Sequence, residues 1–281
     1  MKNYAIVLAT IFMLFFTSCE SWLDIQQEGE VTVDQLYSTG EGYRTALNGV
    51  YQAMGRPALY GREFSFGLVD CMSQQYDLAN ESFSTDLYIK ASEFKYNDVS
   101  LVDFIDNIWT SGFKVIANAN DLIQNIEKAS PELFEEGELE RTLIMGEAYA
   151  CRALMHFDLL RLFAPALVAN PAGIYIPYVT DFPYYGGQSA LSVLETLEKI
   201  EADLLLAKDM IMAYDTLNDA NRRILGDQYR FRIHSFVSNT DDDSDIIPLP
   251  FYQYRGYRIN AMAVTGMLAR LYSYWGGEKL V

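Results

Sequence analysis

Apolar residues that recur every three or four positions constrain the fold of this chain more than any other feature. Between residues 102 and 127, for example, Ile105, Ile108, Gly112 and Ile116 fall on one face of a helix. The same spacing returns in four other stretches, and alternation of the βαβ kind is weak, which disfavours a parallel-sheet fold. The predicted helices cover residues 38–54, 102–127, 138–163, 192–214 and 259–275.

Start and stop signals frame these stretches. Ser38 and Glu41, and again Ser192 and Glu195, have the three-residue spacing of a capping box, which satisfies the first free amides of a helix. Gly55, Pro165 and the Gly276–Gly277 pair follow the predicted ends. The chain therefore divides into five helices with loops of unequal length between them.

The second and third predicted helices begin about thirty-five residues apart, close to the 34-residue tetratricopeptide period. Stacked helix pairs of this kind share one core, because a single pair cannot bury its apolar faces. The alternative is an irregular helical bundle. Either way, we expect one set of apolar side chains to be buried: Trp109, Phe113, Ala150, Leu154, Phe157, Leu204, Leu268 and Tyr272.

Two regions lack the helical period. Residues 56–100 are rich in Tyr, Phe, Asn and Asp. Residues 215–257 contain Tyr229, Phe231 and Ile233 at alternate positions, which predicts a strand, and residues 246–254 could return as a proline-interrupted edge strand. We therefore expect a small β-hairpin insertion in this second region.

The N-terminus has the order of a secretory signal. Lys2 supplies a positive charge, Tyr4 to Phe16 is almost wholly apolar, and small residues precede Cys19. The apolar run is shorter than the ~20 residues that span a bilayer. The end of the run resembles a bacterial lipobox, so we expect residues 1–18 to be a lipoprotein signal peptide and Cys19 to be the acylated first residue. The alternative is a plain secretory signal with a cysteine nearby.

The net charge limits the partners. The chain has a formal net charge of −17, and removal of residues 1–18 takes away Lys2 alone, which makes it −18. Such a surface repels phosphate backbones, so we do not expect this chain to bind nucleic acid. It also offers no polybasic patch for anionic lipids, so membrane attachment would depend on the lipid anchor only.

Few residues could support catalysis or metal binding. His156 and His234 are the two histidines, and no nucleophile motif accompanies them. We assign His156 to the core or the surface rather than to a functional site. His234 lies with Arg230 and Arg232 on the predicted strand, and we interpret the three as paired surface charges, with contact to a carboxylated ligand as the alternative.

Asp241, Asp243 and Asp245 have the spacing of calcium ligands in an EF-hand loop. Ile246 and Tyr252 occupy the positions where that loop needs glycine and glutamate, so we reject an EF-hand. We therefore predict no enzyme, no cofactor and no metal site.

Two cysteines remain after Cys19. A disulfide between Cys71 and Cys151 is possible, but nothing in their spacing suggests a disulfide framework or a metal site. Because Cys151 lies inside a helical pattern, we interpret it as a core residue.

Four stretches, in order, resemble the SusD/RagB family of lipoproteins. The first is CESWLDIQQEGEVT at the mature start, and the second is GEAYACRALMHFDLLRLF at residues 146–163. The others are SVLETLEKIEADLLLA at residues 192–207 and RINAMAVTGMLARLYSYWGG at residues 258–277. The resemblance covers most of the chain apart from the insertion at residues 215–257.

The resemblance implies an outer-membrane, surface-exposed lipoprotein of Bacteroidota, with residues 19–281 as a SusD-like, tetratricopeptide-type helical domain. Family members capture oligosaccharides, or in some cases peptides, and pass them to a SusC-like TonB-dependent transporter beneath them. They are usually much longer than this chain, so a fragment or a reduced relative is expected. The alternative function is a helical-repeat lipoprotein that acts only as a protein-interaction scaffold.

Sugar binding needs flat apolar faces and planar polar groups. The loop-rich residues 56–100 offer Tyr76, Asn80, Phe83, Tyr88 and Tyr96. Tyr184 and Tyr185 form a second aromatic pair before two glycines. We predict a ligand site among these residues. The alternative is that the tyrosines pack over the helices with their hydroxyls in water.

Overall fold

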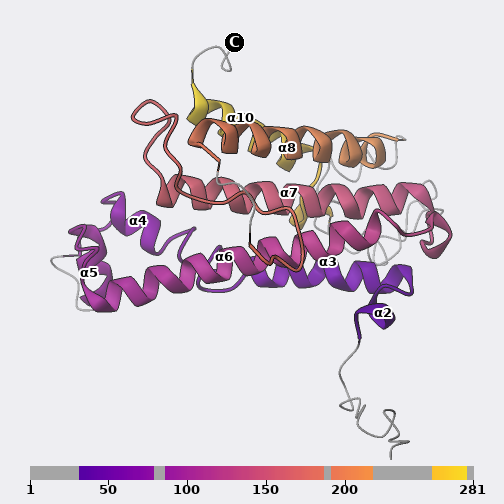
Figure 1. Cartoon of the computed structure of the whole chain (residues 1–281), viewed down its shortest axis with the longest axis horizontal. Helices are drawn as coiled ribbons and strands as arrows, with labels where there is room; N and C mark the ends of the chain where they lie inside the picture. The colour runs from indigo at the N-terminus through magenta and orange to yellow at the C-terminus, as the bar shows by residue number, and fades with distance from the viewer. Residues whose placement is uncertain (1–31, 79–85, 187–190, 218–254, 277–281) are drawn as a thin grey trace, which may run out of the picture. The chain divides into compact units, whose positions relative to one another are not determined.

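α7 (Glu138–Phe163) lies in the middle of a bundle of long helices. It packs against α6 (Val99–Ile126) on one side and α8 (Val193–Asp215) on the other. α3 (Gly40–Met54) lies along α6 and α7, and α10 (Ala261–Trp275) packs against α8 (Figure 1). The computed structural model describes residues 32–78, 86–186, 191–217 and 255–276. The chain divides into two units between Gln35 and Leu36, and the bundle belongs to the second unit.

Short helices complete the described chain. α4 (Leu68–Met72) and α5 (Asp86–Ser92) pack on each other, and α5 also contacts α6. The remaining short helices are α2 (Val33–Leu36), η2 (Pro131–Leu133) and η5 (Arg255–Tyr257). In the described ranges no strand forms, and an isolated bridge joins Ile174 to Ser192. The expected fold class, mainly helical and tetratricopeptide-like, is confirmed, whereas the hairpin predicted between residues 229 and 254 lies outside the described residues.

Side-chain caps mark the starts of α3, α6, α8 and α10, whereas α7 begins after Gly137 without one. Ser192 and Glu195 form the predicted capping box, and α7 has the predicted bounds. The first capping box is wrong: Thr39, not Ser38, caps α3, because its hydroxyl accepts from the Gly42 amide while Glu41 pairs with Arg44.

Two other helix starts differ from the periodicity. α6 begins three residues before the predicted start because the Asp98 carboxylate accepts from the Ser100 amide. α10 begins two residues after the predicted start because the Asn260 side chain accepts from the amides of Met262 and Ala263. In both cases a local cap decided the boundary.

The core contains four of the eight side chains that were expected to be buried: Ala150, Phe157, Leu204 and Leu268. Trp109, Phe113, Leu154 and Tyr272 are only partly buried and pack on the core from outside. Trp109 and Phe113 meet each other, and Trp109 also meets Phe163, so an aromatic group covers one edge of the α6–α7 contact.

Glycines permit close contact between α7 and its neighbours. A Cβ atom on Gly146 would lie 2.8 Å from the Cβ of Met210 on α8. A Cβ on Gly112 of α6 would lie 3.0 Å from a methyl carbon of Leu159. These two positions therefore set how closely α6, α7 and α8 approach.

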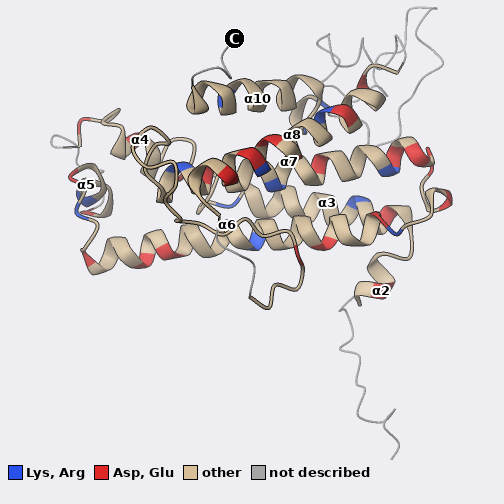
Figure 2. Ribbon diagram, turned by 45° about the horizontal axis from the view of Figure 1, so that its top comes forward, with Lys and Arg blue, Asp and Glu red and all other residues tan. Residues whose placement is uncertain are grey.

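Buried polar networks join the helices. The Arg152 guanidinium on α7 forms two bonds to the Asp203 carboxylate on α8, at 2.7 and 2.8 Å, and one to the Asn120 side chain on α6. The Tyr178 hydroxyl donates to the same aspartate. This network fixes three helices and the connection that precedes α8. Figure 2 shows acidic and basic residues close together along α7.

A second network joins α10 to the bundle. The buried Glu147 carboxylate accepts from the guanidinium groups of Arg255 and Arg258 and from the Tyr51 hydroxyl. Arg255 also pairs with Asp215 at the end of α8, at 3.0 Å. The segment that begins at Arg255 is thereby held against α3, α7 and α8.

Candidate functional site

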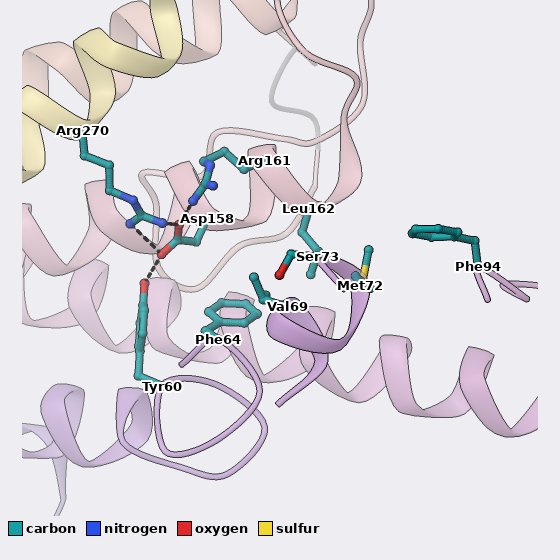
Figure 3. Close-up of a pocket in the computed structure, with 10 residues that line it drawn as sticks. All are labelled: Tyr60, Phe64, Val69, Met72, Ser73, Phe94, Asp158, Arg161, Leu162 and Arg270. Atoms are coloured by element: carbon teal, nitrogen blue, oxygen red, sulfur yellow. Dashed lines mark hydrogen bonds and ion pairs between the residues drawn. The ribbon is translucent and has the colours of Figure 1, made fainter. Parts of the chain in front are cut away.

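A pocket of about 490 Å³ lies beside the C-terminal end of α7. This volume falls within the range of ~300–1,000 Å³ that is common for small-molecule sites. Its walls come from the turns before α4, from α4 and the residue that follows it, from Phe94 two residues after α5, and from α7 and α10 (Figure 3). The lining residues are Tyr60, Phe64, Val69, Met72, Ser73, Phe94, Asp158, Arg161, Leu162 and Arg270.

A buried carboxylate shapes the wall before α4. The Glu63 side chain is fully buried and accepts from the Leu68 amide at the start of α4. It also accepts from the Tyr88 hydroxyl on α5 and pairs with Arg62. Glu63 therefore holds the turns, α4 and α5 together, and so positions Tyr60 and Phe64 at the pocket.

α4 and α5 end in the same unusual way. Gln74 and Phe94 both have positive φ angles, of 61° and 57°. In each case the next amide reaches the carbonyl five residues back: Gln75 bonds Asp70, and Lys95 bonds Lys90. This is the Schellman pattern, in which glycine is the common residue because a side chain is strained there.

Phe94 is the more informative of the two. Its aromatic side chain lines the pocket, yet 53% of the residue is exposed. A bulky residue in a left-handed conformation costs about 1–2 kcal/mol of folding free energy. Because Phe94 is largely exposed, burial of its ring offsets little of this cost. Such strain at a cavity is a reason to examine a residue for function.

A charged group occupies the opposite end of the pocket. Arg161 and Arg270 both pair with the Asp158 carboxylate, at 3.3 and 2.5 Å, and the Tyr60 hydroxyl donates to it at 2.6 Å (Figure 3). Burial is the main cause that raises the pKa of Tyr60 well above its ordinary value, so its hydroxyl stays a donor at neutral pH. The pocket thus has an apolar end around Phe94 and an end rich in fixed donors.

The residues predicted from sequence lie elsewhere. Tyr76 is partly exposed, and its hydroxyl donates to the Phe66 carbonyl. Tyr88 is directed to Glu63, behind the pocket wall. Tyr184 and Tyr185 are exposed after α7 and do not line the pocket. Asn80 and Phe83 lie outside the described residues, so the predicted ligand site remains a prediction.

Only weak signals in the sequence marked the pocket residues that were not predicted. Phe64 and Phe94 belong to the aromatic stretch 56–100, where nothing distinguished them from their neighbours. Asp158 and Arg270 belong to the quoted family motifs. Their convergence could not be seen, because they are 112 residues apart in the chain.

His156 lies in the core, which is one of the two placements, core or surface, that were expected for it. Its Nδ1 lies 2.9 Å from the Arg152 carbonyl, and its Nε2 accepts from the Val179 amide. Burial lowers the pKa of His156 to about 3, so the ring is neutral at ordinary pH.

The cysteines do not form the disulfide that was considered possible. Cys71 in α4 and Cys151 in α7 are both free and buried, and the assignment of Cys151 to the core is confirmed. Burial raises the pKa of the Cys151 thiol. Across the described residues, no group of three or more His, Cys, Asp or Glu side chains could hold a metal ion. Nor does any helix in those ranges have the length and apolar character that a bilayer crossing requires.

The fold and the pocket define a helical, tetratricopeptide-like protein with a ligand-sized cavity. Residues 22–218 match the family model SusD-like_3, described as starch-binding and associating with the outer membrane. Because the match covers more than half of the sequence, the chain belongs to the SusD-like family.

Relatives of similar sequence carry the same family name. A SusD-like protein P2 of Formosa agariphila is 25% identical over 75% of the chain and 38% of its own length. A SusD-like protein of Bacteroides ovatus is 24% identical over 60% of the chain and 29% of its own length. The chain therefore spans less than two fifths of the length of these relatives.

Solved structures share the fold. A SusD superfamily protein of Bacteroides thetaiotaomicron has a TM-score of 0.54 at 21% identity, over 85% of this chain and 43% of its own. A SusD-like carbohydrate binding protein of Bacteroides vulgatus also has a TM-score of 0.54, at 16% identity, over 84% and 42%. At these identities the likeness shows the fold alone.

Proposed function

We propose that this chain is a non-catalytic cell-surface lipoprotein that binds oligosaccharides and passes them to a TonB-dependent outer-membrane transporter. The observation that carries the proposal is the pocket beside α7. It combines exposed aromatic carbon at Phe94 with fixed guanidinium donors at Arg161 and Arg270. Sugars present apolar ring faces and clustered hydroxyls, which require both kinds of contact.

The family supports this choice of ligand class. Its description names starch binding and the outer membrane, and one solved structure of the same fold is titled a carbohydrate binding protein. The chain spans less than half of the length of each of these proteins. We therefore propose the pocket as one contact with the sugar and not as a complete binding site.

Phe94→Gly offers a test that separates binding from folding. Glycine suits the left-handed position, so relief of strain and the flexibility of glycine should leave the free energy of unfolding within about 1 kcal/mol of the wild type. Loss of one aromatic contact, worth about 1 kcal/mol, should weaken binding about fivefold. A glycan array would identify a bound oligosaccharide, and calorimetry would then measure its affinity for both proteins.

Tyr185→Ala is the matched control, since Tyr185 is an exposed aromatic outside the pocket. We expect this variant to bind like the wild type. Loss of affinity in Tyr185→Ala but not in Phe94→Gly would move the ligand to the residues predicted from sequence. Chromatography of the sugar after incubation should show no cleavage, and turnover would contradict the non-catalytic assignment.

A further inference from the structure

The charge of the pocket is opposite to that of the chain. Asp158, Arg161 and Arg270 are its charged lining residues, so the pocket has a net charge of +1 in a chain of −17. Two cations that share one anion cannot both be neutralised by it. The pocket therefore keeps a local excess of one positive charge, which can attract an anionic ligand.

Geometry leaves donors free for such a ligand. The Asp158 side chain is 8% exposed, whereas those of Arg161 and Arg270 are 39% and 43% exposed. A guanidinium has five N–H donors, and within the described part of the chain each arginine pairs with Asp158 as its sole carboxylate. Both side chains therefore have N–H groups that can reach a molecule in the pocket.

Aromatic rings hold the two guanidinium groups in place. The Arg270 group lies 5.2 Å from the centre of the Phe157 ring, and the Arg161 group lies 5.6 Å from the same centre. Arg161 also lies 5.9 Å from the Tyr274 ring. Because stacking and Asp158 fix both side chains before binding, little conformational entropy is lost when an anion arrives.

We propose that this pocket binds a carboxylate-bearing sugar, with a uronic acid residue at the arginine end. The sugar carboxylate would accept from Arg161 and Arg270, whose planar donors match carboxylate geometry. The adjoining sugar would extend past Phe64 toward Phe94, along the apolar part of the pocket (Figure 3). The inference rests on the proposed function and names the substrate class of that site.

The test compares acidic sugars with neutral ones of the same shape. Galacturonate and mannuronate trisaccharides would be titrated into the purified chain, each beside its carboxyl-reduced counterpart. We expect at least one acid to bind about tenfold more tightly than its reduced form, because a charged hydrogen bond is lost on reduction. Added salt should weaken the acid more than the neutral sugar.

Arg161→Gln is the informative variant, because Asp158 keeps Arg270 and Tyr60 as partners. It should lose the preference for the acid, because affinity for the acid should fall more than affinity for the neutral sugar. Lys114→Gln, an equal charge change at an exposed position on α6, should behave as the wild type. Thermal melting of both variants would show that each is folded.

Three results would overturn the inference. Equal binding of acidic and reduced sugars would exclude uronate recognition but leave oligosaccharide binding intact. No binding of any sugar would remove the proposed function as well. Binding of a short peptide through its terminal carboxylate, lost in Arg161→Gln while no sugar binds, would assign the pocket to peptides instead.

Discussion

Single residues on α7 connect neighbouring helices, because each buried polar side chain bonds side chains of another element. Glu147, Arg152 and Asp158 are spaced along the helix, and each bonds side chains from distant parts of the sequence. A buried charge is tolerated only when it is paired and hydrogen-bonded. The polar residues of the GEAYACRALMHFDLLRLF motif are thus explained by contacts within the fold as well as by the pocket.

His156 should make stability depend on pH. Its pKa is about 3 in the folded chain, against about 6.5 when unfolded, so the unfolded state binds one more proton between these values. The stabilisation is fully present above pH 6.5 and is lost as the pH falls toward 3. The slope from this group is about 1.4 kcal/mol per pH unit.

Urea unfolding of the wild type and of His156→Gln, at several pH values from 4 to 7, would isolate this effect. Glutamine can still donate to the Arg152 carbonyl and accept from Val179, but it does not titrate. We expect the difference between the two proteins to shrink as the pH falls. A constant difference would mean that His156 is not the titrating group.

At the scale of elements, α7 needs apolar contact on nearly every face because it lies between α6 and α8. Amphipathic periodicity suits a helix with one exposed face. The periodicity therefore identified α7 with the correct bounds, but it did not separate the fully buried residues of this helix from the partly buried ones. Leu154, which was expected in the core, is partly exposed, while Leu159 and Leu160 are buried.

Leucine-to-alanine substitutions should reveal this difference. Leu159 is 0% exposed and contacts Gly112 of α6, so Leu159→Ala should lower the free energy of unfolding by about 3–5 kcal/mol. Leu154→Ala should cost about 1–2 kcal/mol, because the side chain is only partly buried. Chemical denaturation of both variants would measure the two costs, and equal values would show that the contacts of α7 have been misassigned.

At the scale of the whole molecule, the lipid anchor and the transporter remain predictions. We expect the mature chain to start at Cys19 and to incorporate a fatty-acid probe in cells. Cys19→Ala is the matched control and should not be labelled. Equal labelling of the two proteins would place any acyl group elsewhere.

The same lipidated protein can test the partner. Isolation in mild detergent, followed by mass spectrometry, should recover a TonB-dependent barrel protein. A stable partnership of this kind would bury at least about 1,000 Å². Tight oligosaccharide binding without any recovered barrel would mean that capture does not require the transporter.

The sequence by itself determined the helical class, the five long helices to within three residues at each end, and the family, but it did not predict the short helices α4 and α5. The features that it determined depend on apolar spacing, on caps such as Ser192 and on motifs, all of which lie within a few residues along the chain. Only the tertiary structure decided the pocket, because Tyr60, Asp158 and Arg270 come from three segments whose contacts depend on how α7 and α10 pack. The aromatic side chain of Phe94 could be counted in the sequence. Its exposure and left-handed backbone arise from the end of α5.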